Sequence, residues 1–264
     1  MADYKKDDKI NDVSESFPIT EDRLDYYVAD SNYRKQGDLP DDMLLLYKTV
    51  DNKQPINLML LKGERWVSTS VNQLQLFSNY TSERGNHDYK RQQQLVKHIH
   101  GTSGYKAAIL TTNSALMNVN EGLYVQITRL ISFQEIREKD NKYSRTSLTF
   151  EGGTVVIINL GIEYFTTRFD AALEQLDSYR CSYDMLANYE YIGPTQRSLL
   201  QKHLLDTISP LSPFIQSRIK QLKTKKDFNR YSLSFYNKEM VKITIQPAIT
   251  NGLLTKSDFP DIKF

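Results

Sequence analysis

The sequence has very little cysteine. Cys181 is the single cysteine in 264 residues, so no disulfide can form within the chain and disulfide-stapled secreted scaffolds are excluded. A chain without disulfides is typical of the reducing cytoplasm, where we expect this protein. Cys181 falls in the middle of a predicted helix, which is a poor setting for an activated thiol. The chain must therefore be held together by a hydrophobic core, for which its length is sufficient.

Long apolar runs are also missing. No stretch approaches the ~20 apolar residues of a membrane span, and the start of the chain lacks the apolar region of a signal peptide. We therefore expect no membrane association. The sequence contains no internal repeat and no low-complexity tract. Residues 1–21 are polar and unpatterned, and we expect them to form a disordered acidic lead.

Motifs for catalysis and metal binding are absent as well. The chain has no cysteine pair, no His-Glu-x-x-His and no Gly-x-Ser-x-Gly. His98 and His100 would project from nearly opposite sides of a helix, so they are poorly placed to share a metal. Gly152–Gly153 lies between two predicted strands, whereas a phosphate-binding loop joins a strand to a helix. We expect no metal, no cofactor and no enzymatic activity, with a divergent nuclease kept as an open alternative.

The apolar pattern predicts many strands in the first part of the chain. Gly152–Gly153 separates two β-branched runs, which is a strong indication of a hairpin. Residues 66–77 have strand or short-helix character. The predicted strands are 24–28, 43–50, 56–61, 105–110, 114–119, 123–131, 146–150 and 154–160.

After Gly161 the apolar period changes to that of a helix. One helix is predicted to run to about residue 191, a second over 195–208, and a third from Ser212–Pro213, an N-cap followed by proline at the first helical position. A late hairpin is predicted over 231–245. The face of the first helix is formed by Phe165, Phe169, Leu173, Leu176 and Tyr179.

Together these patterns predict an α+β fold. We expect a mostly antiparallel sheet or small barrel with one inserted basic helix, followed by two or three C-terminal helices and the late hairpin. After the acidic lead, the predicted division is a β-rich core domain over 22–192 and a C-terminal extension over 193–264.

Charge is unevenly distributed along the chain. Through Asp51 there are seven Lys and Arg against thirteen Asp and Glu, which leaves 27 basic and 19 acidic residues for the rest. An acidic end joined to a basic body is typical of proteins that bind a polyanion, although it also occurs where charge serves only solubility.

The basic charge is concentrated between Asn79 and Lys106, around a predicted helix over 84–100. From Arg84 to Lys106, Asp88 is the single acid among these cations, and amide side chains at 92–94 add donors and acceptors suited to phosphates and base edges. A solvated helix face is the simpler interpretation, and it stays open. The candidate DNA-binding residues are Asn79, Tyr80, Arg84, Lys90, Arg91, Gln94, Lys97 and Lys106.

Tyrosines flank the basic stretch. Tyr80, Tyr89, Tyr105 and Tyr124 are placed either to stack on bases or to pack in the core, and half-buried core tyrosines are the commoner of the two.

The order of these segments resembles the ComK family of bacterial competence transcription factors. That family has an aromatic motif ending in arginine, a basic segment, a strand, a strand pair, a hairpin and a helix. The corresponding residues here are 77–84, 90–98, 107–110, 116–117 with 124–127, 146–153 and 164–172, so the resemblance covers residues 74–176. The chain departs from the family's pattern where Gly152 replaces the hairpin asparagine, and between Leu116 and Ile127, where the family's aromatic-Pro-Thr and Cys-x-Trp have no counterpart.

The resemblance implies a cytoplasmic transcriptional activator that binds double-stranded, A·T-rich promoter DNA as a homo-oligomer, largely through the minor groove. It also implies control by adaptor-guided proteolysis. The cations of 84–106 would contact phosphates and the groove, and the second basic run, 218–230, would be an auxiliary phosphate surface or simply the wet face of a helix. A protein-interaction or regulatory adaptor module is the alternative of another class.

Overall fold

The computed structural model describes residues 18–51, 53–85, 89, 108–111, 113–120, 122–137, 144–187, 210–224, 249–250 and 252. For residues 82–85, 178, 181–187 and 224 it describes the backbone alone. The predicted helix 195–208 and the predicted hairpin 231–245 lie outside these ranges.

Seven strands form the larger of two sheets, in the order β2-β5-β4-β3-β8-β7-β6. Neighbouring strands are antiparallel, except that β2 runs parallel to β5. The predicted hairpin of β3 and β4 is confirmed, with Lys53 at a φ of 67° in its turn. The strands are β2 (Asn32–Tyr33), β3 (Met43–Asp51), β4 (Gln54–Leu61), β5 (Arg65–Thr69), β6 (Ile109–Leu110), β7 (Ala115–Asn120) and β8 (Leu123–Gln126).

The smaller sheet has four strands in the order β1-β11-β10-β9. The hairpin predicted around Gly152–Gly153 is confirmed, because β10 and β11 pair antiparallel on either side of it. Both glycines have positive φ, 90° and 85°, a conformation that glycine adopts without steric penalty. The strands are β1 (Ile19–Thr20), β9 (Leu130–Ile136), β10 (Arg145–Phe150) and β11 (Val155–Ile158).

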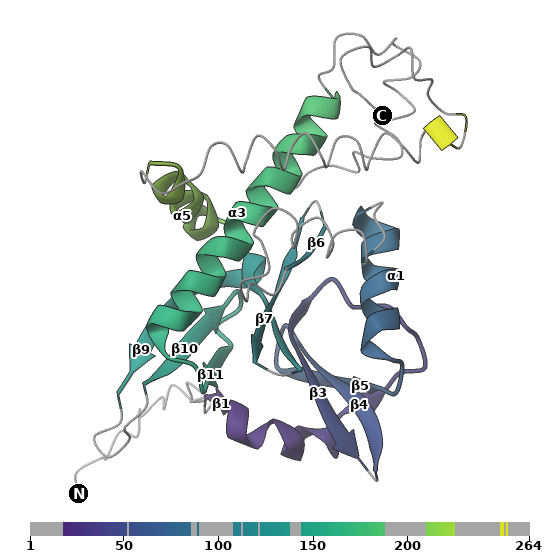
Figure 1. Cartoon of the computed structure of the whole chain (residues 1–264). Helices are drawn as coiled ribbons and strands as arrows, with labels where there is room; N and C mark the ends of the chain where they lie inside the picture. Colours follow the sequence, from purple (N-terminus) through teal and green to yellow (C-terminus); the bar gives the residue numbers. More distant parts are fainter. Residues whose placement is uncertain are drawn as a thin grey trace, which may run out of the picture.

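The strand predicted over 24–28 is wrong. Residues Glu21–Val28 form a 3-10 helix, η1, which lies at the bottom of the molecule in Figure 1. A strand would place Leu24 and Tyr26 on one face, but Leu24 is fully buried whereas Tyr26 is 76% exposed. Side-chain bonds to distant residues hold the helix: the carboxylate of Glu21 accepts from Asn120 Nδ2 and from the backbone N–H of Asn159.

The single strand predicted over 123–131 is also wrong. The chain turns a corner there through a 3-10 helix, η2 (Ile127–Arg129), which separates β8 in the large sheet from β9 in the small sheet. The corner leaves little mark on the apolar pattern, because Ile127 and Leu130 on either side of it are both fully buried in the main core. The described strands therefore form two sheets rather than a small barrel.

Both faces of the large sheet are covered. Along β4, Leu58 and Leu60 belong to the main core, whereas Met59 and Leu61 belong to a second core on the opposite face. The main core is closed by the small sheet and by the long helix α3 (Ile162–Ala187), and the second by α1 (Gln73–Gly85), as Figure 1 shows.

The helix predicted after Gly161 is confirmed as α3. The five residues predicted for its apolar face are all fully buried, namely Phe165, Phe169, Leu173, Leu176 and Tyr179. The helix predicted from Ser212–Pro213 is confirmed as α5 (Pro213–Thr224). Ile215, Ile219 and Leu222 of α5 pack into the same core as α3, although residue 193 is the predicted start of a C-terminal extension.

The fold is thus α+β, with mostly antiparallel sheets, as the sequence predicts. No helix in the described ranges has both the length and the apolar character required to cross a bilayer.

Candidate nucleic-acid interface

Helix α1 leads into the basic stretch. It begins after Asn72, whose side-chain Oδ1 accepts a hydrogen bond from the backbone N–H of Leu74 at 2.8 Å and so caps the helix. Leu76 and Phe77 face the sheet and are buried, while Leu74 is 57% exposed on the outer side. The C-terminal part of α1, up to Gly85, contains the first residues of the predicted interface.

Tyr80 is a core residue, which corrects the expectation that it contacts DNA. Its side chain is 3% exposed, and its hydroxyl makes a hydrogen bond with Ser114 Oγ just before β7. Ser114 Oγ in turn lies 3.0 Å from Thr111 Oγ1. The ring therefore attaches α1 to the turn between β6 and β7, and it is not available to stack on a base.

Asn79 serves an internal contact. Its amide Nδ2 donates to the backbone oxygen of Gly37 at 2.7 Å, and its Oδ1 accepts from Gln75 Nε2 at 2.6 Å. The side chain is half-buried. Asn79 thus ties the loop before β3 to α1, and these two hydrogen bonds occupy part of its capacity for contacting a ligand.

Tyr89 is the one residue between 86 and 107 that the structure describes, and it lies against the second core. Its ring packs on Phe77 with centroids 5.4 Å apart, and Phe77 also meets the ring of Tyr124 at 4.9 Å. Burial, with the neighbouring Tyr124, raises the pKa of Tyr89 to about 12. Burial also raises the pKa of Tyr124. Both rings are half-buried and pack against the second core, one of the two roles that the sequence left open.

Ala108 is the first described residue after the basic stretch. This residue is 1% exposed, and its backbone N–H donates to Gln175 Oε1 of α3 at 3.0 Å. Gln175 is itself 2% exposed. The sequence does not indicate this role of Gln175. A polar residue on a helix is ordinarily expected to be exposed, and the partner of this one lies 67 residues away. The same holds for Ser114 as the partner of Tyr80.

The predicted cations themselves are not described. The side chain of Arg84 and the residues Lys90, Arg91, Gln94, Lys97 and Lys106 lie outside the described ranges, as does Tyr105. The structure does describe the residues on either side of this stretch, in α1 and from Ala108 to β6.

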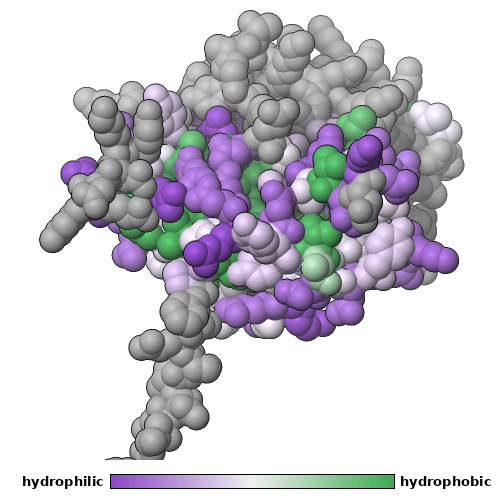
Figure 2. Space-filling model, turned by 90° about the horizontal axis from the view of Figure 1, so that it is seen from below, coloured by the Kyte–Doolittle hydropathy of each residue, from purple (hydrophilic) through white to green (hydrophobic). Residues whose placement is uncertain are grey.

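Many basic side chains elsewhere in the described chain are paired with acids. Arg129 contacts Glu151 at 2.9 Å, so the tip of the β10–β11 hairpin is neutralised locally. Arg145 contacts Asp22 at 3.0 Å. Such pairing leaves little net positive field around these groups. Seen from the side of η1, the coloured surface is mostly hydrophilic, with hydrophobic side chains in separate spots (Figure 2).

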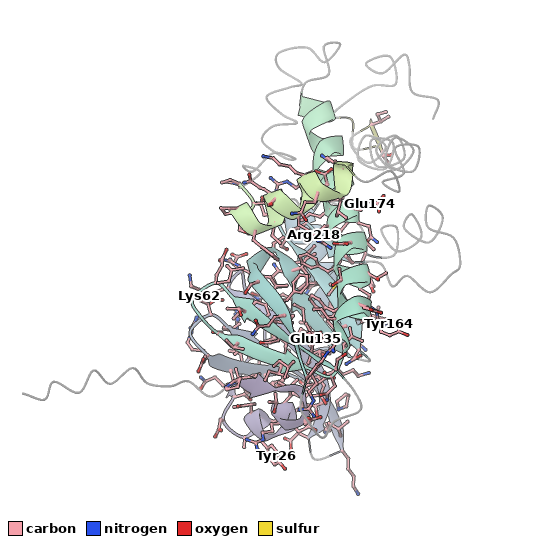
Figure 3. The ribbon with its side chains drawn as sticks, turned by 90° about the vertical axis from the view of Figure 1, so that its left-hand side faces the viewer. Tyr26, Lys62, Glu135, Tyr164, Glu174 and Arg218 are labelled. Atoms are coloured by element: carbon pink, nitrogen blue, oxygen red, sulfur yellow. The ribbon has the colours of Figure 1, made fainter. Side chains whose placement is uncertain are left out.

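The second basic run, 218–230, contains two cations that join α5 to α3, Arg218 and Lys223. Arg218 makes a two-pronged contact with Asp170, with Nε and Nη2 at 2.7 and 2.8 Å from the two carboxylate oxygens. Lys223 Nζ lies 2.6 Å from Asp177 Oδ2. Glu174 lies at the same helix contact (Figure 3), and burial raises its pKa. These two cations hold the helices together, and the run beyond residue 224 is not described.

Metal-binding groupings are missing from the part of the chain that the structure describes: no three His, Cys, Asp or Glu side chains there could hold an ion together. Comparison of the chain with protein-family models, with curated proteins and with solved structures gave no match.

Proposed function

We propose that this protein binds double-stranded, A·T-rich DNA as a transcriptional regulator, through the cations of the stretch from Arg84 to Lys106. The observation that carries the proposal is that this stretch concentrates positive charge and is attached to buried residues at both of its ends. Five Lys and Arg stand against Asp88 alone in this stretch. Its two ends are attached to a buried framework, at Tyr80 and at Ala108.

The attachment matters because binding requires the cations to be presented together. A stretch whose ends are fixed loses less conformational entropy when it binds than one that is free at one end. Tyr80 fixes the entry to the turn before β7, and Gln175 fixes the exit to α3. Both contacts are buried, so water does not compete for them.

The charge would act first on phosphates. Each phosphate that a Lys or Arg neutralises releases condensed counterions, so affinity should fall steeply as salt rises. A preference for A·T-rich duplex would come from its narrow minor groove, whose negative potential attracts inserted arginine. Arg84 and Arg91 are the arginines of this stretch.

The test is fluorescence anisotropy with A·T-rich and G·C-rich duplexes at two salt concentrations. The variant Lys90→Ala/Arg91→Ala/Lys97→Ala should weaken binding to both duplexes. It should also flatten the dependence of log K on log salt, by up to about 0.9 for each phosphate that is no longer neutralised. Arg84→Ala should also reduce the preference for A·T. The matched control is Lys35→Ala/Lys48→Ala/Lys62→Ala, which removes the same charge from exposed positions outside both basic runs.

Three results would contradict the proposal: no binding of the native chain to any duplex, binding that is insensitive to salt, or equally weakened binding in the two triple variants. A partner protein retained in a pull-down after nuclease treatment, together with the first result, would favour the protein-interaction module instead. Metal-dependent plasmid cleavage that is abolished by chelation would favour the nuclease.

A further inference from the structure

Strand β9 lies at one end of the small sheet, on the left in Figure 1. It pairs with β10 on one side, and no strand in the described part of the chain pairs with its other side. Three of its side chains are exposed, namely Ile131 (45%), Ser132 and Gln134. The strand therefore presents an open edge to which a further strand can be added.

The hydrogen bonds of β10 show which backbone groups of β9 lie on this edge. Phe150 makes its backbone hydrogen bonds within the β10–β11 hairpin, so its N–H and C=O face β11. Neighbouring residues of a strand face opposite sides, so Thr149 faces β9, where it lies opposite Ser132. By the same alternation along β9, the N–H and C=O groups of Phe133 and Glu135 point away from β10, to the open edge.

This edge lacks the features that normally keep edge strands from associating, which are short length, proline and lysine. β9 has seven residues and contains neither proline nor lysine. Its one charged residue is Glu135, whose carboxylate is neutralised by Arg137 Nε at 2.9 Å. The other end strands of the two sheets, β1, β2 and β6, have two residues each. Among the described strands, β9 is thus the one long end strand, and it is unprotected.

The two faces of β9 differ in chemistry. Phe133 packs towards the helices, with its ring 6.0 Å from that of Phe214 in α5. Ile131 lies two residues earlier and so on the same face, where it leaves apolar surface exposed beside this aromatic contact. Ser132 and Gln134 lie on the opposite face, which is polar and uncharged along the strand. A strand that covers β9 must show the same alternation of apolar and polar residues.

We propose that this edge pairs antiparallel with β9 of a second copy of the chain, which joins two small sheets into one. A two-fold axis perpendicular to the sheet keeps like faces on the same side, so apolar residues meet apolar ones and polar residues meet polar ones. In the register centred on Phe133, the outward groups of residues 131–135 are all paired. Ser132 then faces Gln134 of the second copy, Ile131 faces its Glu135, and no like charges meet.

Sedimentation velocity of the full chain over a range of concentrations tests the pairing. The native chain should form particles of twice 30.7 kDa. Glu135→Pro removes an N–H that faces the open edge and leaves the bonds to β10 in place. It should raise the Kd of the dimer at least about fivefold, because one backbone hydrogen bond is lost from each copy. Glu135→Ala keeps that N–H and is the control, with a Kd within about twofold of native.

A pair of charge variants tests the register. Ile131→Glu sets a negative charge opposite Glu135 of the second copy at two places in the dimer, and it should raise the Kd. Ile131→Lys sets a positive charge at the same places, so its dimer should be tighter than that of Ile131→Glu. Both variants lose the same apolar side chain, and its exposure makes either change compatible with folding. If urea unfolding shows that Glu135→Pro is not folded, this pair decides the test.

A native chain that stays monomeric at about 100 μM would overturn the inference. So would a dimer whose Kd is the same in the native chain, Glu135→Pro and Ile131→Glu. Equal Kd values for the two Ile131 variants would overturn the register centred on Phe133.

Hydrogen exchange gives a second measurement. The N–H groups of Phe133 and Glu135 should exchange more slowly as the concentration of the pure protein rises. Protection in a cell extract but not in the pure protein would assign the edge to a strand of another protein and overturn the inference. Neither measurement involves DNA, so the inference and the proposed function can fail separately.

Discussion

Gln175 in the middle of α3 accepts a hydrogen bond from the backbone N–H of Ala108, at 3.0 Å and across 67 positions of sequence. Both residues are almost fully buried. The bond joins the helix that closes the main core to the residue just before β6, which follows the basic stretch in the sequence. The side chain of Gln175 therefore links the main core to the end of the basic stretch, the proposed DNA-binding element.

Replacing Gln175 with methionine should destabilise the protein by about 1–3 kcal/mol, because the buried N–H of Ala108 would lose its partner while the side-chain volume is kept. Urea denaturation measures the change. Gln216→Met provides the control, since this glutamine is exposed on α5 and its replacement should change stability by no more than about 0.5 kcal/mol. Equal stabilities of the two variants would show that the Gln175 bond contributes little.

Tyr80→Phe should separate stability from binding. Removing the hydroxyl deprives buried Ser114 of a hydrogen-bond partner, which should lower the free energy of unfolding by about 1 kcal/mol. The Kd for A·T-rich duplex should change little, because the buried ring still packs α1 against the sheet without the hydroxyl and so keeps the entry of the basic stretch in place. Thermal unfolding and anisotropy on the same sample test both parts, and weaker DNA binding at unchanged stability would contradict the core role.

The packing of α5 on α3 should depend on Arg218. Its two-pronged bond to Asp170 is about four-fifths shielded from water, with the two side chains 23% and 19% exposed. Arg218→Ala should therefore cost about 1–3 kcal/mol, the usual range for hydrogen bonds to charged groups. Lys220→Ala, an exposed neighbour on α5, should change stability by less than about 0.5 kcal/mol. A destabilised Arg218→Ala that Asp170→Asn does not reproduce would show that the pair is not the cause.

High pH should weaken the packing of Tyr89 on Phe77. Its pKa is raised from 10.0 to about 12, so in this range the folded chain holds a proton that the unfolded chain has released. The contribution of this tyrosine to the free energy of unfolding is fully present below pH 10. It is lost as the pH rises from 10 towards 12. Tyr89→Phe has no ionisable hydroxyl at this position. Between about pH 9 and about pH 11, the native protein should therefore lose free energy of unfolding relative to Tyr89→Phe. A difference that is constant with pH would contradict the raised pKa.

The elements that sequence predicted correctly are those whose signals are local. The stripe from Phe165 to Tyr179 has helical spacing whatever surrounds it, and Gly152–Gly153 permits a turn that few other residues allow. Ser212 before Pro213 likewise marks the start of a helix without reference to the rest of the chain. In each case the pattern and the backbone preference agree, and the structure follows both.

The elements that sequence missed depend on partners far along the chain. Residues 24–28 have the composition of a strand, yet the bonds of Glu21 to Asn120 and Asn159 hold them as a 3-10 helix. The run 123–131 is apolar throughout much of its length, and its division between two sheets follows from the corner at η2 rather than from any break in the pattern. Tertiary contacts override a local propensity whose whole scale spans only about 1 kcal/mol.

For the candidate interface the same division applies. The sequence by itself determined that basic charge gathers between residues 84 and 106, because charge is a property of each side chain and needs no fold to be counted. Only the tertiary structure decided that Tyr80 and Tyr89 pack inward and that Gln175 holds the exit of the stretch. The physical reason is that burial and hydrogen-bond partners depend on which segments meet, and these segments meet only when the two sheets and α3 have packed together.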